Sequence, residues 1–171
     1  IRSEPGLGSL FGVTVPVLRW GARPEAPRRA AVTSALGHAR VLVVDNDPAA
    51  LAATTALLGK WGLEVVAASD LPGARIACQA APEAAIMDFR LDDDTRGDAV
   101  YLALCEGWGT APPAILLTAE AREKTQQAAL RMDARRLLKP SSPAALRALI
   151  SDAVARGRRS GAQDAGASAA G

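Results

Sequence analysis

Short apolar runs that end in a polar residue are the strongest constraint on how this chain can fold. Four such runs are followed or closed by Asp45, Asp88, Thr118 and Lys139. Apolar runs this short, separated by helix-like stretches, are typical of buried strands in a parallel sheet. The carboxyl ends of parallel strands share one edge, where ligands bind. The sequence therefore predicts that two carboxylates, a hydroxyl and an ammonium converge at one edge of a sheet.

Strand-like and helix-like segments alternate between residues 39 and 155. The apolar pattern predicts strands near residues 39–44, 64–67, 84–88, 114–118 and 136–138. It predicts helices near residues 48–61, 71–80, 98–107, 123–132 and 143–154. Ser142 suits the N-cap of the last helix, and Gly62 suits the C′ position of the first. Five β-then-α units predict an α/β fold with a parallel, doubly wound sheet.

The flanks of this region differ from it in composition and charge. Residues 40–155 carry 12 basic and 15 acidic side chains, whereas the flanks carry 8 and 3. Phe11, Val13 and Val15 alternate as in a single half-buried strand. Residues 17–38 suit a flexible linker, and residues 156–171 suit a disordered tail. We expect no nucleic-acid site, because no basic stripe with interleaved aromatic residues is present.

The cysteines and the hydropathy pattern indicate a cytoplasmic chain. Cys78 and Cys105 lie in apolar, helix-like stretches and lack the spacing of metal ligands or of a CxxC motif. We expect both to be small buried side chains in a reducing compartment. No apolar run approaches the roughly 18–20 residues of a membrane span, so we expect no membrane contact. No signal-peptide pattern opens the chain.

The residues after the first and third predicted strands suit metal-assisted phosphoryl transfer. Asp45, Asn46 and Asp47 form a cluster of oxygen donors, which suits a magnesium ion that keeps several waters. Asp88 is a competent nucleophile toward an activated phosphoryl group when a metal neutralises the developing charge. We expect the run at 92–94 to be a solvated acidic loop.

Thr118 and Lys139 complete the predicted site. The hydroxyl of Thr118 can donate a hydrogen bond to a phosphoryl oxygen, and Lys139 can place a positive charge beside the same group. Each signal is weak alone. Together, on four strand ends, they predict a phosphoryl-transfer site.

Residues 39–155 resemble the receiver domain of two-component signalling proteins, through these four positions and the Lys139-Pro140 pair. The resemblance implies a flavodoxin-like fold with strand order 2-1-3-4-5 and a cis peptide bond before Pro140. It also implies that Asp88 is phosphorylated by a phosphohistidine donor in a magnesium-dependent reaction. The implied metal ligands are Asp45, Asn46, Asp88 and the backbone carbonyl of Arg90, with Asp47 as a further candidate.

Residues 3–16 resemble the last glycine-rich loop and the final strand of a histidine kinase ATP-binding domain. The order of kinase end, linker and receiver implies the C-terminal part of a hybrid sensor histidine kinase. The implied partners are a histidine kinase core as donor and a histidine phosphotransfer protein as acceptor. We assign no kinase activity to this chain, because its only histidine, His38, lies in the linker, where we expect it to be solvated.

Three features depart from the receiver pattern. Asn46 stands where the family usually has a second acid, and Arg136 stands where many receivers have a switching aromatic residue. The loop after Asp88 lacks the usual proline and is one residue longer. These departures leave open the alternative that the chain is a degenerate receiver, which acts only as a protein-docking module. The presence of Asp88, Thr118 and Lys139 is evidence against this alternative.

A second alternative comes from a different class of enzyme. A strand followed by Asp45 and Asp47 also resembles the start of a haloacid-dehalogenase-type phosphatase, with Asp45 as nucleophile and Asp47 as general acid. That family prefers Thr or Val where this chain has Ala49, and it usually needs a longer chain with a cap. The residue that receives the phosphate, Asp45 or Asp88, distinguishes the two classes.

Overall fold

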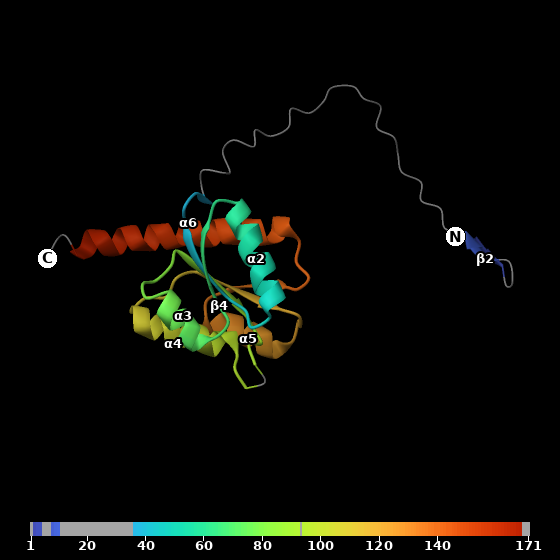
Figure 1. The fold of residues 1–171 in the computed structure, drawn as a ribbon, viewed down its shortest axis with the longest axis horizontal. Helices are drawn as coiled ribbons and strands as arrows, with labels where there is room; N and C mark the ends of the chain where they lie inside the picture. The colour runs from blue at the N-terminus through green and yellow to red at the C-terminus, as the bar shows by residue number, and fades with distance from the viewer. Residues whose placement is uncertain (1, 5–7, 11–35, 93, 169–171) are drawn as a thin grey trace, which may run out of the picture.

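The computed structural model describes residues 2–4, 8–10, 36–92 and 94–168. From residue 36 onward these residues form one α/β unit (Figure 1). Its strands are β3 (Arg40–Val44), β4 (Glu64–Ala68), β5 (Ala84–Asp88), β6 (Ala114–Thr118) and β7 (Arg135–Leu138). Its helices are α2 (Pro48–Lys60), α3 (Leu71–Ala77), α4 (Gly97–Trp108), α5 (Glu123–Arg131) and α6 (Pro143–Ser168).

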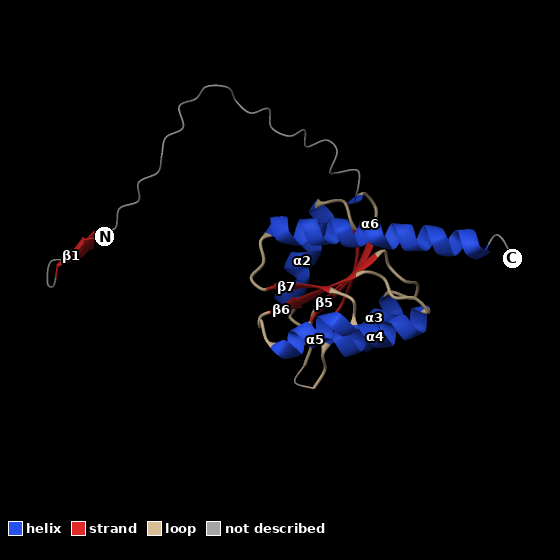
Figure 2. Ribbon diagram, turned by 180° about the vertical axis from the view of Figure 1, so that it is seen from behind, coloured by secondary structure: helices blue, strands red, loops and turns tan. Residues whose placement is uncertain are grey.

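The five strands form a parallel sheet in the order β4-β3-β5-β6-β7. In chain order within this unit, that arrangement is 2-1-3-4-5, which confirms the predicted flavodoxin-like fold. The helices cover both faces of the sheet: α2 and α6 lie on one side, and α3, α4 and α5 lie on the other (Figure 2). The carboxyl ends of all five strands consequently share one edge.

Alternate residues of each central strand fill two separate cores. In β3, Leu42 and Val44 pack with α3 and α4, whereas Val41 and Val43 pack with α2 and α6. The same alternation continues along β5 and β6, whose residues are all buried. Burial on both faces explains why these strands appear in the sequence as continuous apolar runs.

The helix ends follow the capping residues of the sequence. The Asp47 carboxylate accepts hydrogen bonds from the first turn of α2, and Gly62 after that helix has a φ of 83°. Ser142 Oγ accepts a hydrogen bond from Ala145 N at the start of α6, as expected. Helix α3 ends at Ala77, three residues before the predicted end. The Arg40 guanidinium donates to the Ala77 carbonyl there, so a tertiary partner satisfies the helix end.

Helix α6 corrects the prediction of a disordered tail after Ala155, because it continues to Ser168. Gly157 allows the helix to lie directly against β5, since a Cβ at this position would lie 2.0 Å from the Glu83 carbonyl oxygen. Arg158 donates a hydrogen bond to the Gly37 carbonyl, with a donor–acceptor distance of 3.0 Å. These tertiary contacts hold the first turn of the extension, around Gly157 and Arg158, where composition alone favours disorder.

The N-terminal flank also differs from the prediction. Leu36 is fully buried, so the folded unit begins within the predicted linker, while His38 is exposed as expected. Strands β1 (Arg2–Glu4) and β2 (Gly8–Leu10) pair antiparallel, which the sequence pattern did not indicate. The strand predicted around residues 11–15 lies outside the described residues.

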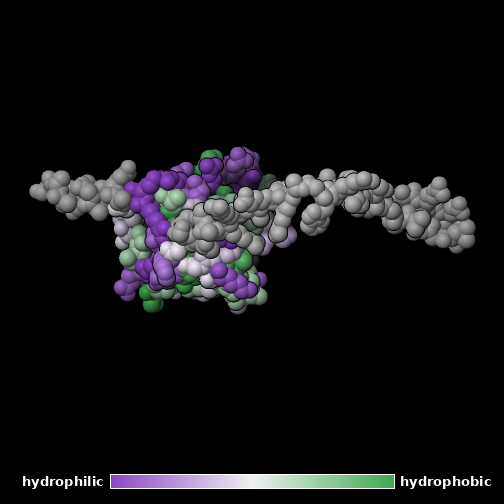
Figure 3. Space-filling model, turned by 90° about the horizontal axis from the view of Figure 1, so that it is seen from above, coloured by the Kyte–Doolittle hydropathy of each residue, from purple (hydrophilic) through white to green (hydrophobic). Residues whose placement is uncertain are grey.

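The surface of the described residues mixes hydrophilic and hydrophobic side chains, as Figure 3 shows for one face. The large exposed hydrophobic side chains are Ile76, Leu102, Leu130 and Leu138, which come from four different elements. Within the described ranges, no helix combines the length and the apolar character that crossing a bilayer requires.

Candidate functional site

Four side chains selected from the sequence meet at the carboxyl edge of the sheet. Asp45 follows β3, Asp88 ends β5, Thr118 ends β6 and Lys139 follows β7. Asp45, Asp88 and Thr118 are buried, with relative exposures of 3%, 8% and 2%. The parallel topology explains this convergence, since the carboxyl end of each strand, or the residue that follows it, lies at the same edge.

Lys139 holds the two carboxylates together. Its Nζ lies 2.8 Å from Asp45 Oδ2 and 2.6 Å from Asp88 Oδ1. Burial acts to lower the pKa of Lys139, but hydrogen bonds and charge attraction from Asp45 and Asp88 outweigh it and raise this pKa above its usual value. The ammonium is therefore charged at neutral pH. The Lys139–Pro140 peptide bond is cis, as the resemblance implies.

The loop that follows β5 fixes the second oxygen of Asp88. The backbone N–H of Arg90 donates to Asp88 Oδ2 at 3.0 Å. Gly97, the first residue of α4, packs against the backbone of Asp88, where a Cβ would lie 2.0 Å from the carbonyl oxygen. Gly97 was not selected from the sequence, where it is only a glycine directly before the helix predicted at residues 98–107.

The Thr118 hydroxyl is turned toward the loop after β6. Thr118 Oγ1 donates to the Glu120 carbonyl and accepts from Glu120 N, both at 3.1 Å. A cavity of about 290 Å³ opens beside it, lined by Asp88, Phe89, Arg90, Thr118, Ala119, Glu120 and Lys139. The Arg90 guanidinium lies 3.6 Å from a Glu120 carboxylate oxygen at this cavity. Glu120 was missed from the sequence because it lies beyond the strand end.

The Asp45 loop provides the remaining oxygen donors. Asp45 Oδ1 accepts a hydrogen bond from Asp47 N at 3.0 Å. Asn46 and Asp47 are exposed, and Asp47 Oδ1 accepts from Ala49 N at 2.8 Å as the N-cap of α2. Asp47 therefore has a structural role, and the pair formed by Asp45 and Asp88 is the acidic centre of the site.

The donor set fits a hard divalent cation such as Mg²⁺. Each oxygen of Asp45 and Asp88 accepts one hydrogen bond or ion pair, which leaves lone pairs available on all four. The Asn46 side chain and the Arg90 carbonyl are neutral oxygen donors in the same two loops. No group of three His, Cys, Asp or Glu side chains suited to a metal ion occurs among the described residues, in keeping with Asn46 at the position of an acid.

Three groups of residues lie outside this constellation. Asp92 and Asp94 are exposed, as expected, and Asp93 is not among the described residues. Arg136 is exposed and donates from Nη1 to Thr125 Oγ1 on α5. Cys78 is buried and Cys105 half-buried, and burial raises the pKa of both thiols, so both are protonated at neutral pH.

Comparisons with known proteins agree with this geometry. Residues 41–151 match the family model of the response regulator receiver domain. A CheY-like receiver domain protein from Methanospirillum hungatei JF-1 superposes with a TM-score of 0.62 at 26% identity, covering 72% of this chain and 99% of that one. The BeF3-activated receiver domain of Klebsiella pneumoniae RstA superposes with a TM-score of 0.56 at 25% identity, covering 67% and 97%.

A more distant structure shows the same fold. The Francisella response regulator 1452 receiver domain superposes with a TM-score of 0.59 at 20% identity, covering 70% of this chain and 98% of that one. No curated protein matches the chain. The extent of the family match, together with the shared fold, shows that this chain belongs to the response regulator receiver domain family.

Proposed function

We propose that this chain accepts a phosphoryl group from phosphohistidine on Asp88, as the phosphoacceptor of a two-component phosphorelay. The observation that carries the proposal is the contact of Lys139 Nζ with both Asp45 and Asp88 beside an open cavity. A buried carboxylate held next to a positive charge that is present at neutral pH is suited to attack an electron-poor phosphorus atom.

In this reaction an oxygen of Asp88 forms a bond to phosphorus while the bond from phosphorus to the imidazole nitrogen breaks. The imidazole keeps the bonding electron pair. Lys139 pairs with the added phosphoryl charge. The Thr118 hydroxyl breaks its hydrogen bond to the Glu120 carbonyl and donates to a phosphoryl oxygen instead. Hydrolysis or transfer to a second histidine then removes the group.

Mg²⁺ is the proposed cofactor. Asp45, Asn46, Asp88 and the Arg90 carbonyl would hold it, and it would neutralise charge on the phosphoryl oxygens. We do not include Asp47 among the ligands, because its Oδ1 caps α2. The same contact argues against a phosphatase in which Asp47 is the general acid.

The cellular setting is part of the same proposal. The resemblance of residues 3–16 to the end of a kinase ATP-binding domain supports a hybrid sensor histidine kinase as the parent protein. The donor would then be a histidine kinase core, and the acceptor a histidine phosphotransfer protein. Two free cysteines support a reducing, cytoplasmic compartment.

Intact-mass measurement tests the phosphoacceptor. We expect acetyl phosphate with Mg²⁺ to add one phosphoryl group to the wild type and none to Asp88→Asn. Asp47→Asn serves as the matched control and is expected to remain phosphorylated. Labelling of Asp45, or of the Asp88→Asn variant, would refute the assignment. A chain that is never labelled would instead be a docking module.

The donor is tested separately. We expect no label from ATP and Mg²⁺ alone, and we expect label on Asp88 once a phosphorylated histidine kinase core is added. Incorporation from ATP in the absence of a kinase would contradict this part of the proposal.

A further inference from the structure

A second cavity, of about 380 Å³, lies at the edge of the sheet opposite the phosphoacceptor. Its lining residues Pro113 and Asp133 come shortly before β6 and β7, whereas Thr118 and Lys139 come at the other ends of these strands. The two sites are thus separated by the length of a strand, roughly 15 Å. The volume lies within the range of about 300–1,000 Å³ that is common for small-molecule sites.

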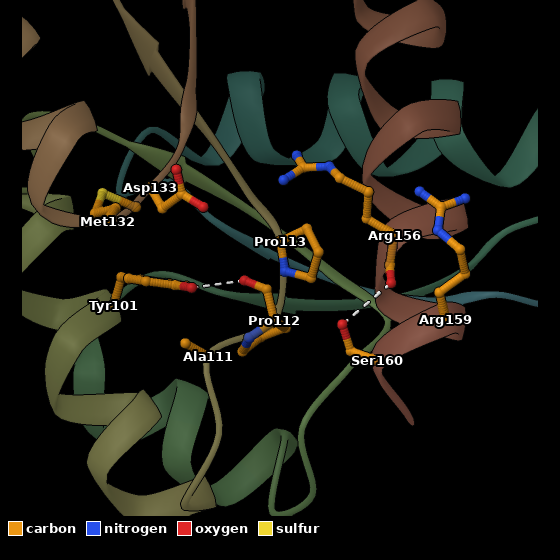
Figure 4. Close-up of a pocket in the computed structure, with 9 residues that line it drawn as sticks. All are labelled: Tyr101, Ala111, Pro112, Pro113, Met132, Asp133, Arg156, Arg159 and Ser160. Atoms are coloured by element: carbon orange, nitrogen blue, oxygen red, sulfur yellow. Dashed lines mark hydrogen bonds between the residues drawn. The ribbon is translucent and has the colours of Figure 1, made fainter. Parts of the chain in front are cut away.

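One side of this cavity is apolar and rigid. Pro112 and Pro113 contribute two consecutive proline rings, and the buried side chains of Tyr101 and Met132 lie beside them (Figure 4). The Tyr101 hydroxyl donates to the Pro112 carbonyl at 2.6 Å. Burial raises the pKa of Tyr101, so the hydroxyl stays protonated and keeps the proline loop in place.

The other side is cationic and is formed by α6. Arg156 and Arg159 both line the cavity from this helix (Figure 4). Arg156 Nε donates to Asp152 Oδ2 at 3.1 Å, but its Nη2 is buried and has no hydrogen-bond partner in the described part of the chain. A buried donor without a partner is unfavourable, so a turn of this guanidinium toward the cavity, where a ligand oxygen could accept from Nη2, would remove that cost.

This cationic side is specific to the C-terminal extension of α6. The family match ends at residue 151, and Arg156, Arg159 and Ser160 lie beyond it. The extension is held in place by the close approach of Gly157 to Glu83 and by the hydrogen bond from Arg158 to Gly37. The cavity is therefore formed between the receiver core and a firmly anchored helix.

We propose that this cavity binds a small organic carboxylate. The carboxylate group would pair with Arg156 and Arg159, whose planar guanidinium groups match its geometry. The apolar body would lie against Tyr101, Pro112 and Pro113. Asp133 adds a negative charge to the lining, which favours a ligand with a single charged group over a polyanion.

This proposal is independent of phosphoryl transfer at Asp88, and binding of benzoate tests it. Benzoate binding is followed by backbone amide chemical shifts in the presence of EDTA. We expect saturable changes around Tyr101, Ala111 and Asp133, with a dissociation constant on the order of 1 mM. Acetate lacks the apolar body and benzyl alcohol lacks the charge, so both are expected to bind at least about tenfold more weakly.

Variants of α6 assign the binding to the cavity. We expect Arg156→Gln and Arg159→Gln each to weaken benzoate binding about tenfold. Arg159 is exposed, so its variant keeps the fold even if Arg156→Gln does not. Lys124→Gln removes a positive charge from an exposed position on α5 outside the cavity, and it is expected to change binding less than about twofold. Non-saturable shifts, or equal losses in all three variants, would overturn the proposal.

Discussion

Arg136 on β7 donates a hydrogen bond to Thr125 on α5, with 3.0 Å between Nη1 and Oγ1. Thr125 is buried, and its hydroxyl lies 2.7 Å from the Arg122 carbonyl and 3.2 Å from that of Glu120. The Glu120 carbonyl also accepts from the Thr118 hydroxyl. Polar contacts thus connect Thr118 to Arg136 through the loop after β6. Arg136 occupies the position where many receivers have an aromatic side chain.

Substitution of Thr125 tests whether this connection transmits phosphorylation. Thr125→Val keeps the shape of the side chain but removes the hydroxyl that Arg136 and the loop carbonyls share. We expect beryllofluoride to bind both proteins, and to shift the β7 amides less in the variant than in the wild type. The variant should also lose about 1–2 kcal/mol of stability, because buried polar groups lose their partner. Equal shifts along β7 would show that the signal takes another route.

Removal of the Lys139 charge should destabilise the protein. Lys139→Met leaves Asp45 and Asp88 facing each other without their shared cation, and we expect a loss of about 1–3 kcal/mol in the free energy of unfolding. Mg²⁺ should restore more stability to the variant than to the wild type, since it supplies the missing positive charge. Thermal unfolding with and without Mg²⁺ measures the difference, and equal stabilisation of both proteins would contradict the prediction.

The pH dependence of stability follows from the same contact. The pKa of Lys139 is raised in the folded protein, so its stabilising contribution is fully present below the ordinary value of 10.5 and is lost as the pH rises through the higher folded value. We expect wild type and Lys139→Met to converge in stability in this alkaline range. Urea unfolding of both proteins isolates Lys139 from the other groups that titrate there.

Asn46 should limit the affinity for Mg²⁺. Asn46→Asp adds a charge beside Asp45 and Asp88, and we expect it to tighten Mg²⁺ binding about tenfold at low ionic strength. Asp47→Ala is the comparison, because Asp47 caps α2. It should cost about 1 kcal/mol of stability and change Mg²⁺ affinity little. Weaker binding in Asp47→Ala would make Asp47 a ligand after all.

The sequence predicted the sheet well because its central strands are buried on both faces. Runs such as Val41–Val44 can only be accommodated between two helical layers, and Ser142 marks the start of α6 by a local hydrogen bond. The end of α6 and the burial of Leu36 could not be predicted in this way. They depend on contacts between segments far apart in the chain, such as Arg158 with Gly37.

The same distinction applies to the site. The convergence of Asp45, Asp88, Thr118 and Lys139 follows from topology, since each lies at a strand end. The roles of Glu120 and Thr125 depend on the path of one loop and on a side chain from a neighbouring strand. The cavity beside α6 could not be predicted from the sequence either, because its arginines lie in a segment whose composition indicated disorder.

Three helical glycines allow the two ends of the domain to be tested separately. A Cβ at Gly97 would lie 2.0 Å from the Asp88 carbonyl oxygen, and one at Gly157 would lie 2.0 Å from that of Glu83, whereas Gly107 has open space around it. Gly107→Ala should therefore stabilise the protein by up to about 1 kcal/mol through helix propensity. Gly97→Ala and Gly157→Ala should each destabilise it by about 1–3 kcal/mol, because the backbone has to move apart.

The two destabilised variants should differ in function. Gly97→Ala displaces the backbone that carries Asp88, so we expect slower phosphorylation by acetyl phosphate and unchanged benzoate binding. Gly157→Ala tilts α6 away from Glu83, so we expect weaker benzoate binding and an unchanged rate of phosphorylation. Phosphorylation rates and benzoate titrations on the same three variants decide this. If both variants lost both activities together, the two ends of the domain would not be independent, and the loss would reflect general unfolding.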